Sequence, residues 1–271
     1  MKLSDIGPVV LVGAGKMGLA LAQGWIAGGL APERLVLCDP HPGDPALRFA
    51  DKHGVQLLDS PLGVLTHVLV LAVKPQVIYD VMAEIKPAVG PHTLVLSIAA
   101  GIPLVGLSEG LMTNRVVRTM PNTPAQVGKG MIGAVGFDIG EDDRAIADAL
   151  LKTGGEVMWF EDEAALDAVT AVSGSGPAYV FHFVEALAAA GARQGLGADE
   201  AMRLARGTVI GAAALLEADA SPAGQLRENV TSPKGTTAAA LAVLMGPGGL
   251  EPLLDKAVEA ARRRSEELGK V

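Results

Sequence analysis

The glycine pattern Gly13-x-Gly15-x-x-Gly18 constrains this chain more than any other feature, because it follows the apolar run Val9–Val12 and begins a helical stretch. In a strand–turn–helix unit the first glycine permits a tight turn, the second lets the backbone approach a pyrophosphate, and the third lets helix and strand pack closely. The pyrophosphate then lies against free N–H groups at the helix N-terminus. A simple glycine turn is the weaker interpretation in this context. The predicted cofactor-binding residues of this loop are Gly13, Ala14, Gly15, Lys16, Met17 and Gly18.

Short apolar runs alternate with stretches of helical spacing from the N-terminus to Phe160. Strands rich in Val and Leu that alternate with helices are typical of βαβ units around a parallel sheet. This part of the chain is therefore predicted to be a Rossmann-like, doubly wound α/β domain with a mainly parallel sheet. The predicted strands are Val9–Val12, Leu35–Leu37, Val68–Val73, Leu94–Leu96 and Val116–Val117, with Ile132–Phe137 and Val157–Phe160 extending the same sheet.

The composition changes after Glu161, and from Ala164 onward the sequence shows only Ala- and Leu-rich helical stretches with Gly or Pro breaks. The pattern predicts two domains, a dinucleotide-binding domain over residues 1–162 and an all-helical domain over residues 163–271. The clearest predicted helices of the second domain are Phe181–Ala192, Asp199–Ala218, Thr236–Met245 and Glu251–Leu268.

Asp39 follows the second predicted strand, about 20 residues beyond Gly18, where an acidic residue bonds the ribose hydroxyls of NAD and repels the extra phosphate of NADP. A capping or turn aspartate at the start of Asp39-Pro40-His41-Pro42 is the alternative. A nearby His41 or Arg48 could accommodate a 2′-phosphate. Asp39 is therefore predicted to lie in the cofactor site, with NADPH and NADH both left open.

Polar or small residues also follow three further predicted strands. Ligands bind at the carboxyl ends of the strands in an open parallel sheet. Lys74 is therefore expected to contact the ribose or phosphate, and the small residues after Ser97 would let a nicotinamide ring lie against the backbone. A solvated lysine or a simple turn is the alternative at any one of these positions. The residues predicted from these strand ends are Ala72, Val73, Lys74, Pro75, Ala99, Ala100 and Asn122.

Two motifs stand out in the helical part. Ser173–Tyr179 is a Gly/Ser turn before a helix with Pro177 near its start, and a connector with capping serines explains at least part of it. Asn229–Thr237 gathers several hydroxyls and free backbone N–H groups at a helix N-terminus, which suits a small carboxylate. Capping alone would need a single Ser or Thr, so this second motif is predicted to bind a ligand.

Taken together, these stretches resemble the pyrroline-5-carboxylate reductase family. The glycine loop is generic, whereas the last three motifs are highly specific in combination, and all occur in the family's order over nearly the whole chain. The resemblance implies hydride transfer from NADPH or NADH to the C5=N carbon of 1-pyrroline-5-carboxylate, giving L-proline in the last step of proline biosynthesis. The stretches that carry it are the glycine loop, Ala72–Pro75, Arg118–Pro124, Ser173–Tyr179 and Ser232–Thr237.

By this resemblance, Ser232 and the backbone N–H groups of Gly235 and Thr236 hold the substrate carboxylate. Thr237 would place its hydroxyl beside the ring nitrogen, as a hydrogen-bond partner or as the proton donor in catalysis. A threonine hydroxyl is a poor general acid, so two alternatives stay open: the imine arrives protonated, or water delivers the proton.

Two residues depart from the family pattern. Lys234 stands where the family usually has a small residue, often Gly, and it is expected to point to solvent, the alternative being a charge contact with the carboxylate. Asp39 stands where the family often has Ser or a similar neutral residue that suits NADPH. Asp39 therefore puts an NADPH-only assignment in doubt.

The resemblance also implies an obligate homodimer, in which the partner's helical domain completes each active site, and larger assemblies of dimers occur in the family. The residues offer consistent support, because a helix as apolar all round as Thr208–Leu216 needs covering on more than one face.

Composition excludes several other classes. A net charge of −8 without a basic stripe speaks against nucleic-acid binding. Cys38 is the only cysteine, which fits a reducing compartment, and the five histidines show no metal-ligand spacing, so no metal site is predicted. With neither a signal-peptide pattern nor a membrane-spanning stretch in the sequence, we expect a soluble cytoplasmic protein.

Three other functions are the alternatives to this one. A β-hydroxyacid dehydrogenase would place a catalytic lysine in the stretch Ser173–Glu185, which contains none. A non-catalytic nucleotide sensor would have lost the carboxylate loop, whereas Ser232, Gly235 and Thr237 are all present. A reductase of another cyclic imine, such as a six-membered ring, is harder to exclude.

Overall fold

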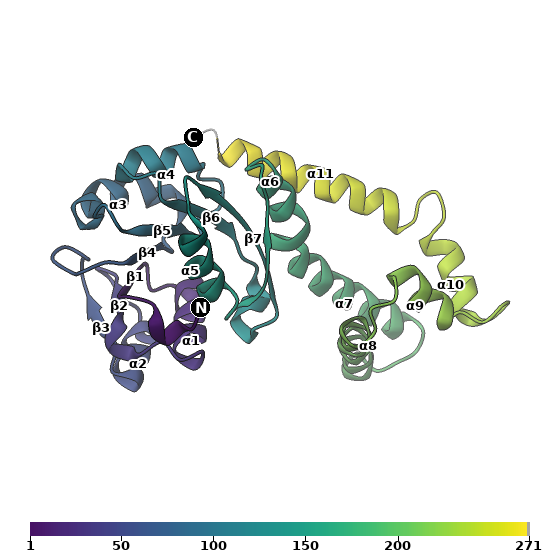
Figure 1. Cartoon of the computed structure of the whole chain (residues 1–271). Coiled ribbons are helices and arrows are strands. Elements are labelled where there is room, and N and C mark those ends of the chain that lie inside the picture. The colour runs from purple at the N-terminus through teal and green to yellow at the C-terminus, as the bar shows by residue number, and fades with distance from the viewer. Residues whose placement is uncertain (270–271) are drawn as a thin grey trace. The chain divides into compact units, whose positions relative to one another are not determined.

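The computed structural model describes residues 1–269 of the chain (Figure 1). The chain forms two compact units. The first contains Met1–Ser175 together with the chain from Ala261 on, and the second contains Gly176–Ala260. The C-terminal end of the described chain therefore belongs to the same unit as the N-terminus.

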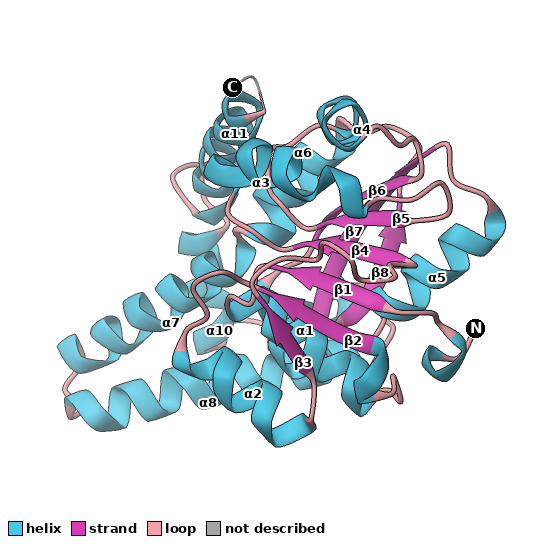
Figure 2. Cartoon of the chain, turned by 90° about the vertical axis from the view of Figure 1, so that its left-hand side faces the viewer, coloured by secondary structure: helices cyan, strands magenta, loops and turns pink. Residues whose placement is uncertain are grey.

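One eight-stranded sheet forms the centre of the first unit, and its strands lie side by side in Figure 2. In order across the sheet, the strands are β3 (Gln56–Leu58), β2 (Leu35–Cys38), β1 (Val9–Val12), β4 (Val68–Leu71), β5 (Leu94–Ser97), β6 (Val116–Met120), β7 (Gly130–Phe137) and β8 (Gly155–Trp159). All neighbours are parallel except β6 and β7. Every residue of β1, β2, β4 and β5 is buried, as expected for strands covered on both faces.

Helices cover the two faces of the sheet, each over its own apolar core. Alternate residues of β1 divide between them, since Val9 and Leu11 belong to one core and Val10 to the other. The first core includes the fully buried Trp25, whose indole N–H donates to the carbonyl of Leu150 at 3.0 Å. It is covered by α1 (Lys16–Ala27), α2 (Asp44–His53) and α5 (Glu141–Leu151), and the second core by α3 (Ile78–Ile85) and α4 (Leu104–Leu111).

The predicted fold class, a Rossmann-like and mainly parallel sheet followed by helices, is confirmed, but three details differ. β3 was not predicted, because this edge strand has only three residues and its two leucines are too few to form a recognisable apolar run. The strand predicted over Val68–Val73 ends at Leu71, and the residues after it form a loop. β7 runs antiparallel to β6 because the segment between them has no room for a crossover helix.

The second unit is helical over its described residues. Its helices are α7 (Gly176–Arg193), α8 (Ala198–Ala218), α9 (Ala223–Asn229), α10 (Thr236–Leu244) and the larger part of α11 (Leu250–Leu268). α7 begins earlier than predicted because Pro177 fits the first turn of a helix. The short α9 was not predicted. None of the helices in residues 1–269 combines the length and apolarity needed to cross a bilayer.

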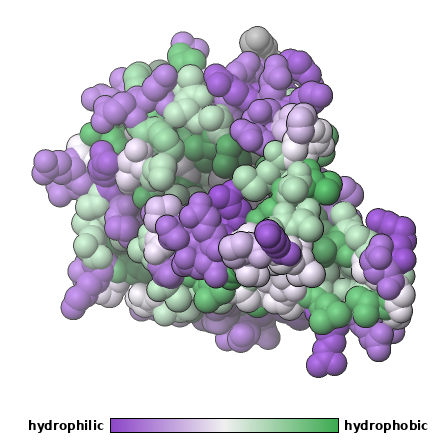
Figure 3. All heavy atoms as spheres, turned by 90° about the vertical axis from the view of Figure 1, so that its right-hand side faces the viewer, coloured by the Kyte–Doolittle hydropathy of each residue, from purple (hydrophilic) through white to green (hydrophobic). Residues whose placement is uncertain are grey.

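The buried core of the second unit is small and consists of alanines, with Val184 packed against it. Its larger apolar side chains are exposed instead, and Figure 3, which faces the right-hand side of Figure 1, shows green apolar atoms at the surface among purple polar ones. The more exposed examples are Phe181, Leu204, Ile210, Leu215, Val243 and Leu253.

Cys38 ends β2 and is only 1% exposed. Burial disfavours the charged thiolate and raises the pKa of the Cys38 thiol to about 12. Because the thiolate is the reactive form, we expect the native protein to react with Ellman's reagent at pH 8 about 1,000-fold more slowly than the urea-unfolded chain. Stopped-flow absorbance gives both rates, and equal rates would contradict the burial of this thiol.

Candidate functional site

The order of the strands along the chain reverses between β1 and β4, and the loops after these two strands border the crevice where ligands of such sheets bind. Gly13 begins the first loop with φ of +98°, and a Cβ on it would come within 2.8 Å of the carbonyl group of Ala72. A Cβ on Gly18 would come 2.5 Å from the carbonyl oxygen of Gly13. The turn at Gly13 and the packing of α1 at Gly18 therefore both require glycine.

Gly15 has no such structural requirement. Its φ is −77°, and no heavy atom lies within 4 Å of where its Cβ would be. Gly15 is the N-cap of α1, and no side chain caps this helix. The first N–H groups of a helix have no partner within it, and they favour an anion. Open space and uncapped N–H groups at Lys16 and Met17 fit a pyrophosphate, which supports a dinucleotide at this point.

Asp39 connects the end of β2 to the glycine loop. Its Oδ2 accepts the backbone N–H of Ala14 at 3.0 Å, and its Oδ1 accepts the N–H of His41 at 3.0 Å. The second bond closes a local turn of the kind that aspartate commonly makes. The N-cap of α2 is Gly43, so Asp39 does not cap that helix. The fold thus places Asp39 beside the predicted phosphate loop, with its carboxylate held by two donors.

The residues after β4 lie against the same loop. The N–H of Ala72 donates to the carbonyl of Val12 at 2.8 Å, and the backbone of Val73 closely approaches Gly13. Lys74 is exposed and extended, and Pro75 starts a 3-10 turn directly after it. These predicted residues are therefore brought together with the glycine loop at the carboxyl edge of the sheet.

The loop after β5 ends at the same edge and is tightly held. The buried Ser97 accepts the N–H of Ala99 on its hydroxyl at 3.3 Å, and Ala99 is itself only 3% exposed. Ala100 is half-buried. Gly101 has φ of +78°, and a Cβ there would come 3.1 Å from the Cβ of Leu268 near the end of α11. Because the residues of this loop are small, a flat ring such as nicotinamide could lie directly against its backbone.

Asn122 follows β6, and its side-chain amide is already bound within the protein. Its Nδ2 donates to the carbonyl and hydroxyl oxygens of Ser173 at 3.2 and 3.1 Å, and its Oδ1 accepts the N–H of Met131 at 3.0 Å. Ser173 lies in a π-helical turn, Thr170–Gly174, of a kind often found at functional sites. The side chain of Asn122 thus anchors the Gly/Ser motif to the sheet. Only the backbone of Asn122 is then left to contact a cofactor at the sheet edge.

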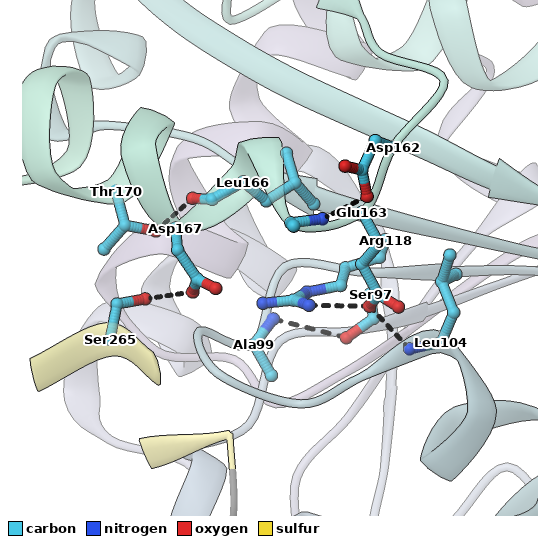
Figure 4. Close-up of polar contacts among 11 residues, drawn as sticks. Ser97, Ala99, Leu104, Arg118, Asp162, Glu163, Leu166, Asp167, Thr170 and Ser265 are labelled. Carbon is cyan, nitrogen blue, oxygen red and sulfur yellow. Dashed lines mark hydrogen bonds and ion pairs between the residues drawn. The ribbon is translucent and has the colours of Figure 1, made fainter. Parts of the chain in front are cut away.

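A buried ion pair that the sequence analysis missed joins three elements of the first unit (Figure 4). Arg118 of β6 is 7% exposed, and its Nη1 lies 2.6 Å from Oε1 of Glu163. The same oxygen accepts the N–H of Leu104 at 2.7 Å, at the start of α4. Nearby in the same view, the hydroxyl of Ser265 donates to Asp167 at 2.6 Å. An arginine inside a buried strand signals that a partner exists, but nothing local identifies Glu163 as that partner.

Of the predicted carboxylate residues, all in the second unit, Ser232 and Gly235 lie on the loop between α9 and α10, and Thr236 and Thr237 begin α10. Gly235 is the N-cap of α10, and no side chain caps this helix. Its own N–H donates to the carbonyl of Ser232 at 3.0 Å, so of the two N–H groups predicted to bind the carboxylate, that of Thr236 is left for a ligand. A Cβ on Gly235 would come 2.5 Å from the Ser232 hydroxyl. Glycine therefore lets Ser232 lie close to the helix start, where Thr237 is half-buried.

Lys234 has φ of +60°, in the left-handed region that favours glycine. For a residue with a side chain this conformation costs about 1–2 kcal/mol. The turn before Gly235 thus requires a positive φ, which explains why a glycine would suit this position. The Lys234 side chain is exposed.

Family models match two parts of the chain separately. Residues 163–268 match a model described as pyrroline-5-carboxylate reductase dimerisation. Residues 8–101 match a model described as NADP oxidoreductase, coenzyme F420-dependent. The first match contains the loop before α10, and the second contains the glycine loop and Asp39.

Several relatives that match over nearly the whole chain are named pyrroline-5-carboxylate reductase. The pyrroline-5-carboxylate reductase of Pisum sativum is 39% identical over 270 residues, 98% of this chain and 97% of that one. The Pseudomonas aeruginosa protein of the same name is 39% identical and covers 96% of each chain. A solved pyrroline-5-carboxylate reductase from Coxiella burnetii is 35% identical, with a TM-score of 0.90 over 98% of this chain and 99% of its own. A Plasmodium falciparum pyrroline carboxylate reductase with NADP bound is 29% identical, with a TM-score of 0.82 over 97% and 98%.

Proposed function

Because this chain belongs to the pyrroline-5-carboxylate reductase family, it is an NAD(P)H-dependent oxidoreductase of proline biosynthesis, and we propose that it reduces the C5=N bond of 1-pyrroline-5-carboxylate to give L-proline. The observation that carries the proposal is the presence on one chain of two loops before uncapped helices: the glycine loop, with open space at Gly15 before α1, and the turn in which Gly235 lets the Ser232 hydroxyl lie close to the start of α10. The first suits a pyrophosphate and the second a small carboxylate. The reaction needs one site of each kind.

NAD(P)H bound at the strand edge of the first unit supplies the hydride. The N–H groups at the start of α1 hold the pyrophosphate, and the small residues after β5 leave room for a flat ring against the backbone. Holding the reacting carbon in line contributes several kcal/mol of barrier reduction. The residues that we propose for this site are Gly13, Ala14, Gly15, Lys16, Met17, Gly18, Asp39, Ala72, Val73, Lys74, Pro75, Ala99, Ala100 and Asn122.

The loop before α10 holds the substrate in this proposal. The Ser232 hydroxyl and the N–H of Thr236 donate to the carboxylate, and the bare Cα of Gly235 leaves the space between them. Thr237 places its hydroxyl beside the ring nitrogen. Because a threonine hydroxyl is a poor acid, its main contribution is orientation of the imine rather than proton transfer.

Replacing Thr237 by alanine is expected to lower kcat about 10- to 100-fold, because a hydrogen bond to a charged group contributes about 1.5–3 kcal/mol. Thr237→Ser keeps the hydroxyl and is expected to retain most of the rate. Steady-state assays of both variants at saturating cofactor separate kcat from KM. Full activity of Thr237→Ala would remove this residue from the catalytic site.

We propose that the chain acts as a homodimer formed through the second unit. Only Ala188, Ala201 and Ala205 of this unit are buried as a core, while large apolar side chains stay exposed. A groove of about 400 Å³ between α7 and α8 is lined mainly by apolar residues, including Phe181 and Ile210. Large exposed apolar patches mark protein interfaces. The match of residues 163–268 to a dimerisation model supports the same assignment.

The dimer proposal predicts a mass in solution twice that of the chain. Replacing Ile210, which is 67% exposed, by glutamate is expected to shift the protein toward monomer because a charge would be buried at the interface. Light scattering coupled to size exclusion measures both masses. A monomeric wild-type protein at micromolar concentration would overturn the proposal.

Two further assignments belong to the same proposal. Residues 1–162 bind the dinucleotide, and residues 163–271 bind the substrate carboxylate and form the dimer. A cytoplasmic location suits a biosynthetic reductase whose one cysteine is buried and unpaired.

The test of the proposed function follows absorbance at 340 nm when purified protein is mixed with 1-pyrroline-5-carboxylate and either NADH or NADPH. We expect oxidation of at least one cofactor and formation of one proline for each cofactor consumed. A six-membered cyclic imine carboxylate serves as the competing substrate. Absence of turnover with both cofactors, or a clear preference for the six-membered ring, would overturn the assignment.

A further inference from the structure

The end of β2 presents one carboxylate at the edge where the cofactor would bind, and the fold holds that carboxylate in place. We infer that Asp39 makes this enzyme select NADH over NADPH, an inference that rests on the proposed function and names the cofactor of the same site. Asp39 is bound to the glycine loop through Ala14 at 3.0 Å and to its own turn through His41 at 3.0 Å. Its position is therefore tied to the residues that would hold the pyrophosphate.

The remaining hydrogen-bonding capacity of Asp39 suits a ribose. A carboxylate offers about four acceptor positions, and each oxygen of Asp39 uses one in the bonds to Ala14 and His41. One position on each oxygen is left, and Asp39 is half-exposed. The two hydroxyls of an unmodified adenosine ribose can donate to these positions, as in other sheets of this class. A 2′-phosphate has no such donor and meets the carboxylate as a like charge.

The charged residues that follow Asp39 in the chain do not offset that repulsion. A site for a 2′-phosphate normally supplies an arginine, and the candidate here is Arg48 of α2. The guanidinium of Arg48 lies 3.8 Å from Asp44, an acidic residue in the first turn of the same helix. The segment between Asp39 and Arg48 therefore carries two carboxylates against one guanidinium, and His41 in the same segment is exposed.

A purely local role does not account for the residue. The bond from Asp39 to His41 closes a turn, and asparagine or serine would close it without a charge. The bond to Ala14 spans 25 positions of the sequence and joins the turn to the cofactor loop. An ionised group at this point has a direct consequence for an anionic ligand, whereas a neutral turn residue has none.

Steady-state kinetics with 1-pyrroline-5-carboxylate test the inference through the ratio of kcat/KM for NADH to that for NADPH. We expect the wild-type ratio to favour NADH about tenfold or more, and Asp39→Ser to shift it toward NADPH by about tenfold or more, mainly through a lower KM for NADPH. The matched control is Asp51→Asn, which removes the same charge from an exposed position elsewhere on α2 and should leave the ratio unchanged.

Binding measurements give a second readout that does not depend on turnover. Calorimetric titration with NAD⁺ and NADP⁺ compares wild type with Asp39→Asn, which keeps the shape of the side chain and removes its charge. We expect wild type to bind NAD⁺ more tightly, and Asp39→Asn to narrow the difference. A wild-type preference for NADPH or NADP⁺, or ratios that neither variant moves, would overturn the inference and leave the proposed reaction standing. Preferential NAD⁺ binding without any turnover would instead refute the proposed reaction alone.

Discussion

Alanine at Gly15 is expected to leave the protein folded and to remove most of its affinity for the cofactor. The φ of Gly15 is one that alanine adopts, and open space surrounds the position of its Cβ. A methyl group there would nevertheless occupy the space through which a pyrophosphate reaches the N–H groups of α1. Loss of the hydrogen bonds between these N–H groups and the charged pyrophosphate is expected to raise the Kd for the cofactor about 10- to 100-fold. Fluorescence titration with NADH and a thermal melt measure the two effects separately.

Gly13→Ala is the matched comparison, because it makes the same chemical change two residues away. Its φ of +98° strains any side chain, and the new Cβ would meet the backbone of Ala72 at 2.8 Å. Ala72 cannot withdraw freely, since its N–H donates to the carbonyl of Val12. We expect Gly13→Ala to lower the free energy of unfolding by about 2–4 kcal/mol. If Gly15→Ala unfolds the protein, or Gly13→Ala matches wild type in stability, these separate roles are wrong.

Replacing Arg118 by methionine is expected to cost about 3 kcal/mol of stability, because it leaves the carboxylate of Glu163 without its counter-charge in a largely buried place. Glu163 keeps 29% of its side chain exposed, which places the expected loss at the lower end for a broken buried pair. Its oxygen would still accept the N–H of Leu104. Urea unfolding followed by circular dichroism measures the change.

Two controls make the Arg118 prediction specific. Arg262→Ala breaks an exposed ion pair with Glu266 and is expected to change stability by less than about 1 kcal/mol. The double variant Arg118→Met with Glu163→Gln removes both charges of the buried pair, and we expect it to recover part of the loss. If Arg118→Met costs no more than Arg262→Ala, the pair does not hold β6, α4 and the start of the helical region together.

The order and type of most elements were accessible from the sequence, because they depend on near neighbours in the chain. Continuous apolar runs indicated β1, β2, β4 and β5, and periodic spacing indicated α8 and α11. The glycine loop could also be predicted from the sequence, since its three glycines lie close together in the chain. β3 and α9 are among the elements that were missed; both are short and neither contains a buried residue, so they leave no pattern of their own.

Within the candidate site, the sequence predicted residues, and the structure shows partners for them that the sequence could not. Asp39 was predicted at the strand end, with a capping role as the alternative, and only the folded chain shows its bond to Ala14. Asn122 was predicted from its motif, whereas its side chain proves to be bound to Ser173. The N–H of Gly235 was assigned to a ligand, but the turn itself uses it.

The sequence by itself determined the fold class and the family, and it predicted the cofactor loop, because each depends on residue types in fixed local spacing. Only the tertiary structure decided which residues meet: Arg118 with Glu163, 45 positions apart, and Asp39 with Ala14, 25 apart. The tertiary structure also decided the antiparallel direction of β7, since that direction depends on the short connection after β6. The physical reason is that hydrogen bonds and ion pairs are chosen by proximity in space, which long-range packing creates and local periodicity does not record.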